Sequence, residues 1–160
     1  MIPRQLRSDE DMAPILALLR VAFAGMEGRI DPPSSLHQLT EDEIAEQARI
    51  GEVWVIGEQA CVFLTPRPEA DPPELYLGKL AVHPGAQRQG LARSLIHLAE
   101  QRARALGLSV LRLKTRVELV ENHRTFERLG FTKTAAHSHP GFDRPTSFEF
   151  SKVIVPAPGI

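Results

Sequence analysis

The spacing of apolar residues along the chain separates helical from extended segments. Apolar positions recur at helical spacing over 15–23, more weakly over 40–49, and most clearly over 90–106. Either Glu10 or Asp11 is expected to cap the first of these helices, because Pro14 is tolerated only in a first turn. Gly107 is expected to end the third helix, and Gly130 follows a shorter fourth helix that ends at Leu129.

The remaining apolar segments are short, lack helical spacing and predict strands. Two of them, 53–57 and 60–65, are separated by a tight turn and predict a β-hairpin. The segment 66–73 contains four prolines in eight residues, which predicts a loop. The full set of expected strands is 2–7, 53–57, 60–65, 74–82, 110–114, 131–136 and 146–155.

This order of elements predicts an α/β fold of layered α+β type. A hairpin followed by strand, helix, strand, helix, strand and strand implies a mixed, mostly antiparallel central sheet. We expect about six or seven strands and about four flanking helices. A chain of 160 residues is long enough for one domain, so 1–160 is interpreted as a single domain.

Charge and composition argue against several classes of partner. The chain has 19 Lys and Arg against 20 Asp and Glu, a net charge of −1, so no overall field favours nucleic acid or an anionic membrane. No apolar run approaches the roughly 18 residues of a membrane span. The first residues turn polar at once, unlike a signal peptide. We therefore expect a cytoplasmic protein with neither a nucleic acid nor a membrane as its partner.

One junction between a strand and a helix has an unusual composition. It reads VHPGAQRQGLARSL over 82–95, within a segment, 75–99, that contains no Asp or Glu. The first turn of a helix presents free amides and the positive end of the helix dipole, which together favour a phosphate. Gly90 lets a ligand approach the backbone, and Arg88 and Arg93 add positive charge. An ordinary connecting loop, in which Gly90 only makes the turn, is the alternative.

Two motifs connect this junction to a known family. LAVHPGAQRQGLARSLI, over 80–96, resembles the acetyl-CoA signature of the GNAT N-acetyltransferases, and NHRTFERLGF, over 122–131, resembles that family's second conserved segment. The resemblance extends over about 53–155. It implies the acyl-CoA N-acyltransferase (GNAT) fold, with acetyl-CoA as cosubstrate.

The resemblance also implies which residues contact the coenzyme. The strand 74–82 would splay from 110–114, with Gly78 as the expected site of a bulge. The main chain of Leu80, Ala81 and Val82 would then pair with the pantetheine arm, and Asn122 and Phe126 would contact the coenzyme from the later helix. The residues expected to hold the pyrophosphate are Gln87, Arg88, Gln89, Gly90, Leu91, Ala92 and Arg93.

The catalytic groups are less evident. Family members often place a tyrosine, as proton donor to the leaving thiolate, at the position of Phe126, which cannot donate. Glu74 is our first candidate for the general base and Tyr76 the second, because alternation places both on one face of a strand. Each assignment has a structural alternative: Phe126 as a core aromatic, Glu74 as the start of a strand, and Asn122 as a helix N-cap.

These observations predict an acyltransferase that moves an acetyl group from acetyl-CoA to a primary amine by direct attack in a ternary complex. The amine belongs to a small molecule, a peptide or a protein, and a homodimer is left open. The acidic stretch 41–46 either attracts a cationic acceptor or is a solvated helix face. The loop 137–143 has two histidines but no further ligands at metal-binding spacing, so no metal is expected. A non-catalytic acyl-CoA-binding or sensing module, suggested by Phe126, is the alternative.

Overall fold

The computed structural model describes residues 2–155, and its elements follow the predicted order. Its helices are α1 (Ala13–Phe23), α2 (Glu41–Ile50), α3 (Leu91–Ala105) and α4 (Val120–Arg128), and short 3-10 turns lie at Ala24–Met26, Ser35–Gln38 and Pro84–Ala86. The strands are β1 (Arg4–Gln5), β2 (Glu52–Ile56), β3 (Ala60–Arg67), β4 (Glu74–Val82), β5 (Val110–Arg116), β6 (Thr132–His137) and β7 (Ser147–Val153).

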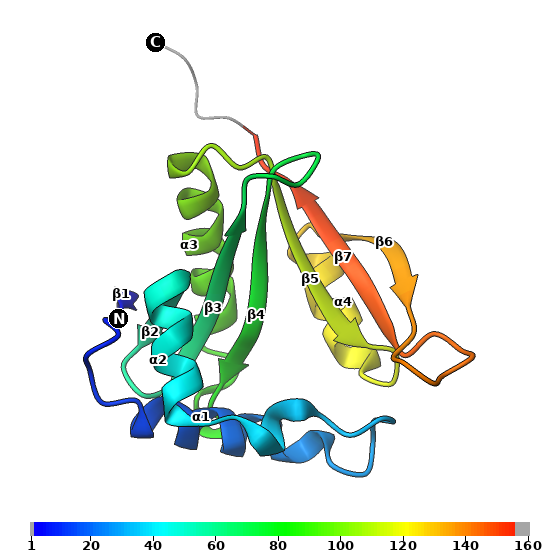
Figure 1. The fold of residues 1–160 in the computed structure, drawn as a ribbon, viewed down its shortest axis with the longest axis horizontal. Coiled ribbons are helices and arrows are strands. Elements are labelled where there is room, and N and C mark those ends of the chain that lie inside the picture. The colour runs from blue at the N-terminus through cyan, green and yellow to red at the C-terminus, as the bar shows by residue number, and fades with distance from the viewer. Residues whose placement is uncertain (1, 156–160) are drawn as a thin grey trace.

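The strands form one seven-stranded sheet in the order β1-β2-β3-β4-β5-β7-β6. Only β4 and β5 run parallel, and every other neighbouring pair is antiparallel. This confirms the predicted mixed, mostly antiparallel sheet with flanking helices. Figure 1 shows that β4 and β5 lie together at one end and diverge toward the end that α1 crosses.

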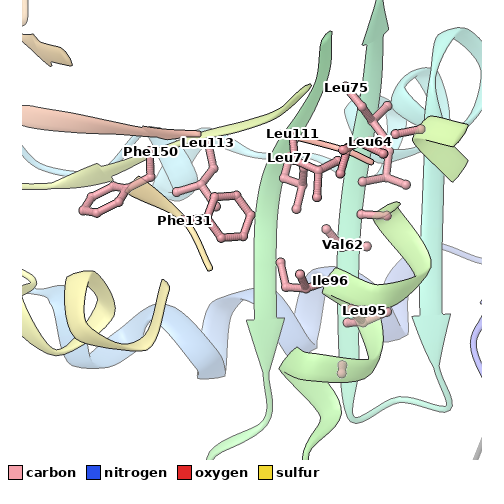
Figure 2. Close-up of a cluster of buried hydrophobic side chains, with 14 of the residues drawn as sticks. Val62, Leu64, Leu75, Leu77, Leu95, Ile96, Leu111, Leu113, Phe131 and Phe150 are labelled. Atoms are coloured by element: carbon pink, nitrogen blue, oxygen red, sulfur yellow. The ribbon is translucent and has the colours of Figure 1, made fainter. Parts of the chain in front are cut away.

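Buried side chains on the two faces of the sheet form two cores. On one face, residues of α1 and α2 pack against β2 and β3 around Val53 and Cys61. On the other face α3 covers the sheet, and in Figure 2 Ile96 of that helix lies near Val62 of β3. The second core continues past the divergence to Phe131 and Phe150. Hydrophobic burial on the α3 face therefore holds the two halves of the sheet together around the divergence.

The predicted loop 66–73 is wrong at its beginning, because β3 continues through Pro66 and Arg67, which pair with Leu75 and Glu74 of β4. The pairing of β2 with β3 ends at Leu64. The missing N–H of Pro66 therefore faces no β2 partner, and a proline is tolerated where a strand has such an open edge.

Two helix ends also differ from the predictions. Met12, rather than Glu10 or Asp11, is the N-cap of α1, although the Asp11 carboxylate accepts a hydrogen bond from the Ala13 amide at 3.0 Å. Leu106 is the C-cap of α3, and Gly107 follows it with φ +71°. Within residues 2–155, no helix has the length and apolar character needed to cross a membrane.

Candidate active site

The divergence of β4 and β5 opens the centre of the sheet. The two strands pair only from Glu74–Val110 to Leu77–Leu113, although β4 continues to Val82. Beyond Leu77, the backbone edge of β4 that faces β5 has no strand partner. The expected splay is therefore present, and a row of backbone donors and acceptors lies along the opening.

A β-bulge accompanies the divergence, one residue later than predicted. Phe63 pairs with Gly78 and Cys61 pairs with Ala81, so Lys79 and Leu80 lie opposite one residue of β3. Lys79, not Gly78, takes the left-handed conformation, with φ +43°. A Cβ at Gly78 would make only ordinary contacts, so the bulge does not require glycine there.

A cavity of about 400 Å³ lies between the diverging strands. Its walls come from β4, β5, one face of α4, the end of α1 with the segment after it, and the β6–β7 connection. The lining includes five of the residues singled out from the sequence: Tyr76, Gly78, Leu80, Asn122 and Phe126. The structure thus brings together predicted site residues that lie up to 50 positions apart in the chain.

The junction between β4 and α3 has the backbone geometry of an anion cradle. Within the described residues, the amides from Gln87 to Arg93 donate no backbone hydrogen bond. Arg88 and Gly90 have φ values of +66° and +77°, which turn neighbouring amides toward one side of the loop. A Cβ at Gly90 would meet nothing within 4 Å, so the space beside this residue is open. The loop is therefore suited to hold a phosphate at the start of α3.

Phe126 and Asn122 lie on the face of α4 that meets the cavity. Phe126 packs with Phe131 and Phe150, at ring centroid distances of 5.8 and 6.2 Å, and also lines the cavity. Phe126 is therefore both a core aromatic and part of the cavity wall. Asn122 is not the N-cap of α4, which is Leu119. Its side chain is left to face the cavity instead.

Glu74 does not line the cavity. One of its carboxylate oxygens accepts from Arg112 Nε at 2.8 Å, and the other accepts from Arg67 at 3.3 Å. Arg112 in turn donates to Glu149 at 2.8 Å. The carboxylate is thus held by two guanidinium groups outside the cavity, and this geometry assigns Glu74 a structural role.

Tyr76 lies on the same face of β4 as Glu74 and reaches the cavity. Arg67 covers its ring, with the guanidinium carbon 4.2 Å from the ring centroid. Burial raises the pKa of the Tyr76 phenol, an effect that the Arg67 charge opposes. A phenol with a raised pKa stays protonated at neutral pH, so Tyr76 is suited to donate a proton rather than to accept one.

His139, one of the two histidines of the loop 137–143, also lines the cavity. Its backbone N–H donates to the Thr146 hydroxyl at 2.9 Å, and its Nδ1 is in hydrogen-bond contact with the same oxygen. Burial, and then the charges of Arg116 and Lys114, lower the pKa of His139, while Glu118 opposes the shift. The imidazole is therefore neutral at pH 7. Only its position two residues after His137, in a loop joining two strands, was visible in the sequence.

The acidic stretch 41–46 lies outside the cavity. Thr40 and Glu43 form a capping box at the start of α2, and Glu46 pairs with Arg49 on the same helix. Carboxylates in a first turn stabilise the helix through its dipole. Of the two interpretations of this stretch, the exposed helix face therefore accounts for it. Among residues 2–155, no three His, Cys, Asp or Glu side chains gather as a metal site would require.

Comparisons with known proteins agree with this geometry. A family model described as the acetyltransferase (GNAT) family matches residues 19–131. A protein of Lactobacillus delbrueckii subsp. lactis, described as an uncharacterized N-acetyltransferase, is 27% identical over 92% of this chain and 95% of its own length.

Solved structures share the fold at lower identity. Ard1 from Thermoplasma volcanium superposes with a TM-score of 0.70 at 16% identity, covering 96% of this chain and 97% of that one. The NatC complex bound to Gag peptide and CoA includes a chain with a TM-score of 0.66 at 15% identity, covering 96% of this chain and 98% of that one.

Proposed function

The chain belongs to the acetyltransferase (GNAT) family, and on that premise we propose that it transfers an acetyl group from acetyl-CoA to a primary amine in a ternary complex. Enzymes of this family are acyltransferases that use acetyl-CoA. The observation that carries the proposal is the open edge of β4, which leads from the cavity toward the amide cradle at the start of α3.

The coenzyme is proposed to lie along this edge. The amides of Gln87 to Arg93 hold the pyrophosphate at the helix N-terminus. The pantetheine arm pairs with the main chain of Leu80, Ala81 and Val82, as an added strand pairs with a sheet edge. Asn122 and Phe126 contact the arm from the opposite wall of the cavity.

The reaction needs a neutral amine and a donor for the developing oxyanion. We assign the proton from the amine to His139, which is held neutral at the cavity wall. An unpaired backbone N–H of β4 between Leu80 and Val82 is proposed to stabilise the oxyanion. As the new C–N bond replaces the C–S bond, the thiolate takes a proton from Tyr76, whose phenol is protonated.

This assignment compensates for Phe126, which cannot donate a proton. Tyr76 lines the same cavity from β4 and carries the phenol that the second motif lacks. A thiolate, with a pKa of about 8.5 judged from cysteine, also leaves with modest assistance. The non-catalytic alternative therefore has no observation in its favour beyond Phe126 itself.

Binding and turnover test the proposal separately. Coenzyme A at millimolar concentration should raise the melting temperature of the full chain. Acetyl-CoA with a panel of primary amines should then release free thiol. Acetyl-CoA that produces neither a thermal shift nor calorimetric heat would falsify the proposal, and binding without thiol release from any amine would favour a sensing module.

A further inference from the structure

Most of the half-buried cations in the described part of the chain are neutralised by carboxylates. Among residues 2–155 there are six such side chains, and Arg67, Arg102, Arg112 and Lys152 each lie within 3.3 Å of a carboxylate oxygen. The other two, Lys79 and Arg116, have no carboxylate oxygen within 4.0 Å of a charged nitrogen in the described residues. Both line the cavity between β4 and β5.

The rest of the cavity wall adds to this excess of positive charge. Lys114 also lines it and forms no ion pair within the described residues, and no Asp or Glu belongs to the lining. Burial lowers the pKa of both Lys79 and Arg116, even though Glu43 acts on the first and Glu118 and Asp31 on the second in the opposite sense. Burying a cation that has no facing carboxylate costs free energy, because the cation loses water without gaining a partner. A ligand that carries a negative charge would remove this cost.

The coenzyme's pyrophosphate does not account for this positive charge. We place the pyrophosphate at 87–93, and none of these residues lines the cavity. The cations instead lie where β4 and β5 diverge and where the segment after α1 closes the opening. Arg116 is held there by hydrogen bonds from its guanidinium to the carbonyl oxygens of Pro32 and Pro33, at 2.6 and 3.3 Å.

An apolar pocket continues from the same place. A second cavity, of about 550 Å³, shares Phe23, Met26, Ser34 and Leu36 with the first. It extends past Ile30, and most of its accessible wall is apolar. A molecule that reaches both cavities therefore meets cations and an apolar wall side by side.

We propose that the acceptor is a small amine that carries both a carboxylate and an apolar substituent, as a free apolar amino acid does. This inference rests on the proposed acetyl transfer and names the substrate class of that site. The carboxylate pairs with Arg116, Lys79 and Lys114, and the substituent enters the pocket beside Phe23 and Met26.

The same charges serve the chemistry. Cations close to an ammonium group lower its pKa and raise the fraction of neutral amine that can attack. The lone pair of the neutral amine forms the bond to the acetyl carbon, and the carbon–sulfur bond breaks as the thiolate takes a proton from Tyr76. The extra proton left on the acylated nitrogen passes to His139. The product is an N-acetyl amino acid, whose carboxylate stays paired until release.

The test compares acceptors that differ in one group at a time. Thiol release from acetyl-CoA is measured with leucine, leucinamide, 3-methylbutylamine and glycine. Leucine should exceed leucinamide and 3-methylbutylamine by about tenfold or more in kcat/KM, since each lacks one charge-assisted pairing. Glycine should also fall by about tenfold, because it leaves the apolar pocket unfilled. Equal rates for leucine and 3-methylbutylamine would overturn the inference while leaving the acetyltransferase proposal intact.

Two variants test whether the cations of the cavity cause the preference for a carboxylate. Lys79→Met and Arg116→Met should each reduce the ratio of leucine to leucinamide, toward one, with the coenzyme A dissociation constant changed by less than about threefold. Lys133→Met, on exposed β6, is the control and should keep the wild-type ratio. A loss of coenzyme A affinity with an unchanged ratio would show that the cations serve the coenzyme. Failure of every amine, together with failure to bind coenzyme A, would overturn the proposed function itself.

Discussion

Leu77 of β4 and Leu113 of β5 are the last residues that these two parallel strands pair. Both side chains are buried in the core that α3 covers. The two strands are therefore held together by core packing at the last paired position before they diverge. Beyond this leucine pair lie the bulge at Lys79, the unpaired edge of β4 and the cavity. The pair therefore marks the boundary between the closed part of the sheet and the part that forms the candidate site.

Gly90 should matter to coenzyme binding, and Gly107 offers a matched control. Both flank α3, both have φ between +71° and +77°, and neither would place a Cβ within 4 Å of another group. Alanine at either position costs about 1–2 kcal/mol through left-handed strain. Only Gly90→Ala introduces a methyl beside the amide cradle, and it should weaken coenzyme A binding about tenfold by calorimetry. Equal affinities for the two variants would argue against the cradle.

Tyr76→Phe should separate catalysis from binding. The substitution keeps the ring under Arg67 and removes only the hydroxyl. Loss of a general acid should lower kcat by about 10²–10⁴-fold, while the melting temperature and the coenzyme A dissociation constant stay near the wild-type values. Full activity in this variant would exclude the phenol as the proton donor and leave that role to another group.

His139 should determine the acid side of the pH–rate profile. Because its pKa lies below the ordinary value of about 6.5, the imidazole accepts a proton at neutral pH and loses that ability only as the pH falls below this value. At pH values below the His139 pKa, log kcat/KM should rise with pH at a slope of two, because both the amine and the histidine must lose a proton. Above that pKa the slope should be one, because only the amine still has to lose a proton.

The variant His139→Gln should remove the steeper limb and lower kcat by about 10²-fold. His137→Gln is the control, because His137 lies two residues earlier and contacts Glu149 at 3.2 Å without lining the cavity. A steep limb that persists in the His139 variant would assign it to a different group.

Glu74→Gln should affect stability rather than catalysis. The Glu74 side chain is 9% exposed and holds Arg112 across β4 and β5. Because Arg112 keeps its contact with Glu149, the loss in unfolding free energy should be about 1–3 kcal/mol by denaturant titration. The kcat of the folded variant should stay within about threefold of wild type. A hundredfold drop in kcat with unchanged stability would restore Glu74 as the general base.

Local features of the sequence determined the elements, their order and the fold class. Helical spacing and alternation predicted α3 and β4 nearly to the residue, because each is long, strongly patterned and bounded by glycine or proline. The junction at 82–95 is equally local, since the glycines, the arginines and the missing carboxylates are contiguous. Local patterns could not show that β3 runs through Pro66, because a neighbouring strand's end decides whether the missing N–H matters.

Only the tertiary structure decided which side chains share the cavity. Glu74 and Tyr76 look equivalent along the strand, yet Arg112, from a strand 38 positions away, binds one and leaves the other at the opening. His139 reaches the cavity because β6 and β7 carry their connection to the end where β4 and β5 diverge. The sequence likewise could not show that Lys79 and Arg116 lack a carboxylate partner among the described residues. Charge pairing depends on distances across strands, and these distances are set by the packing of the whole sheet.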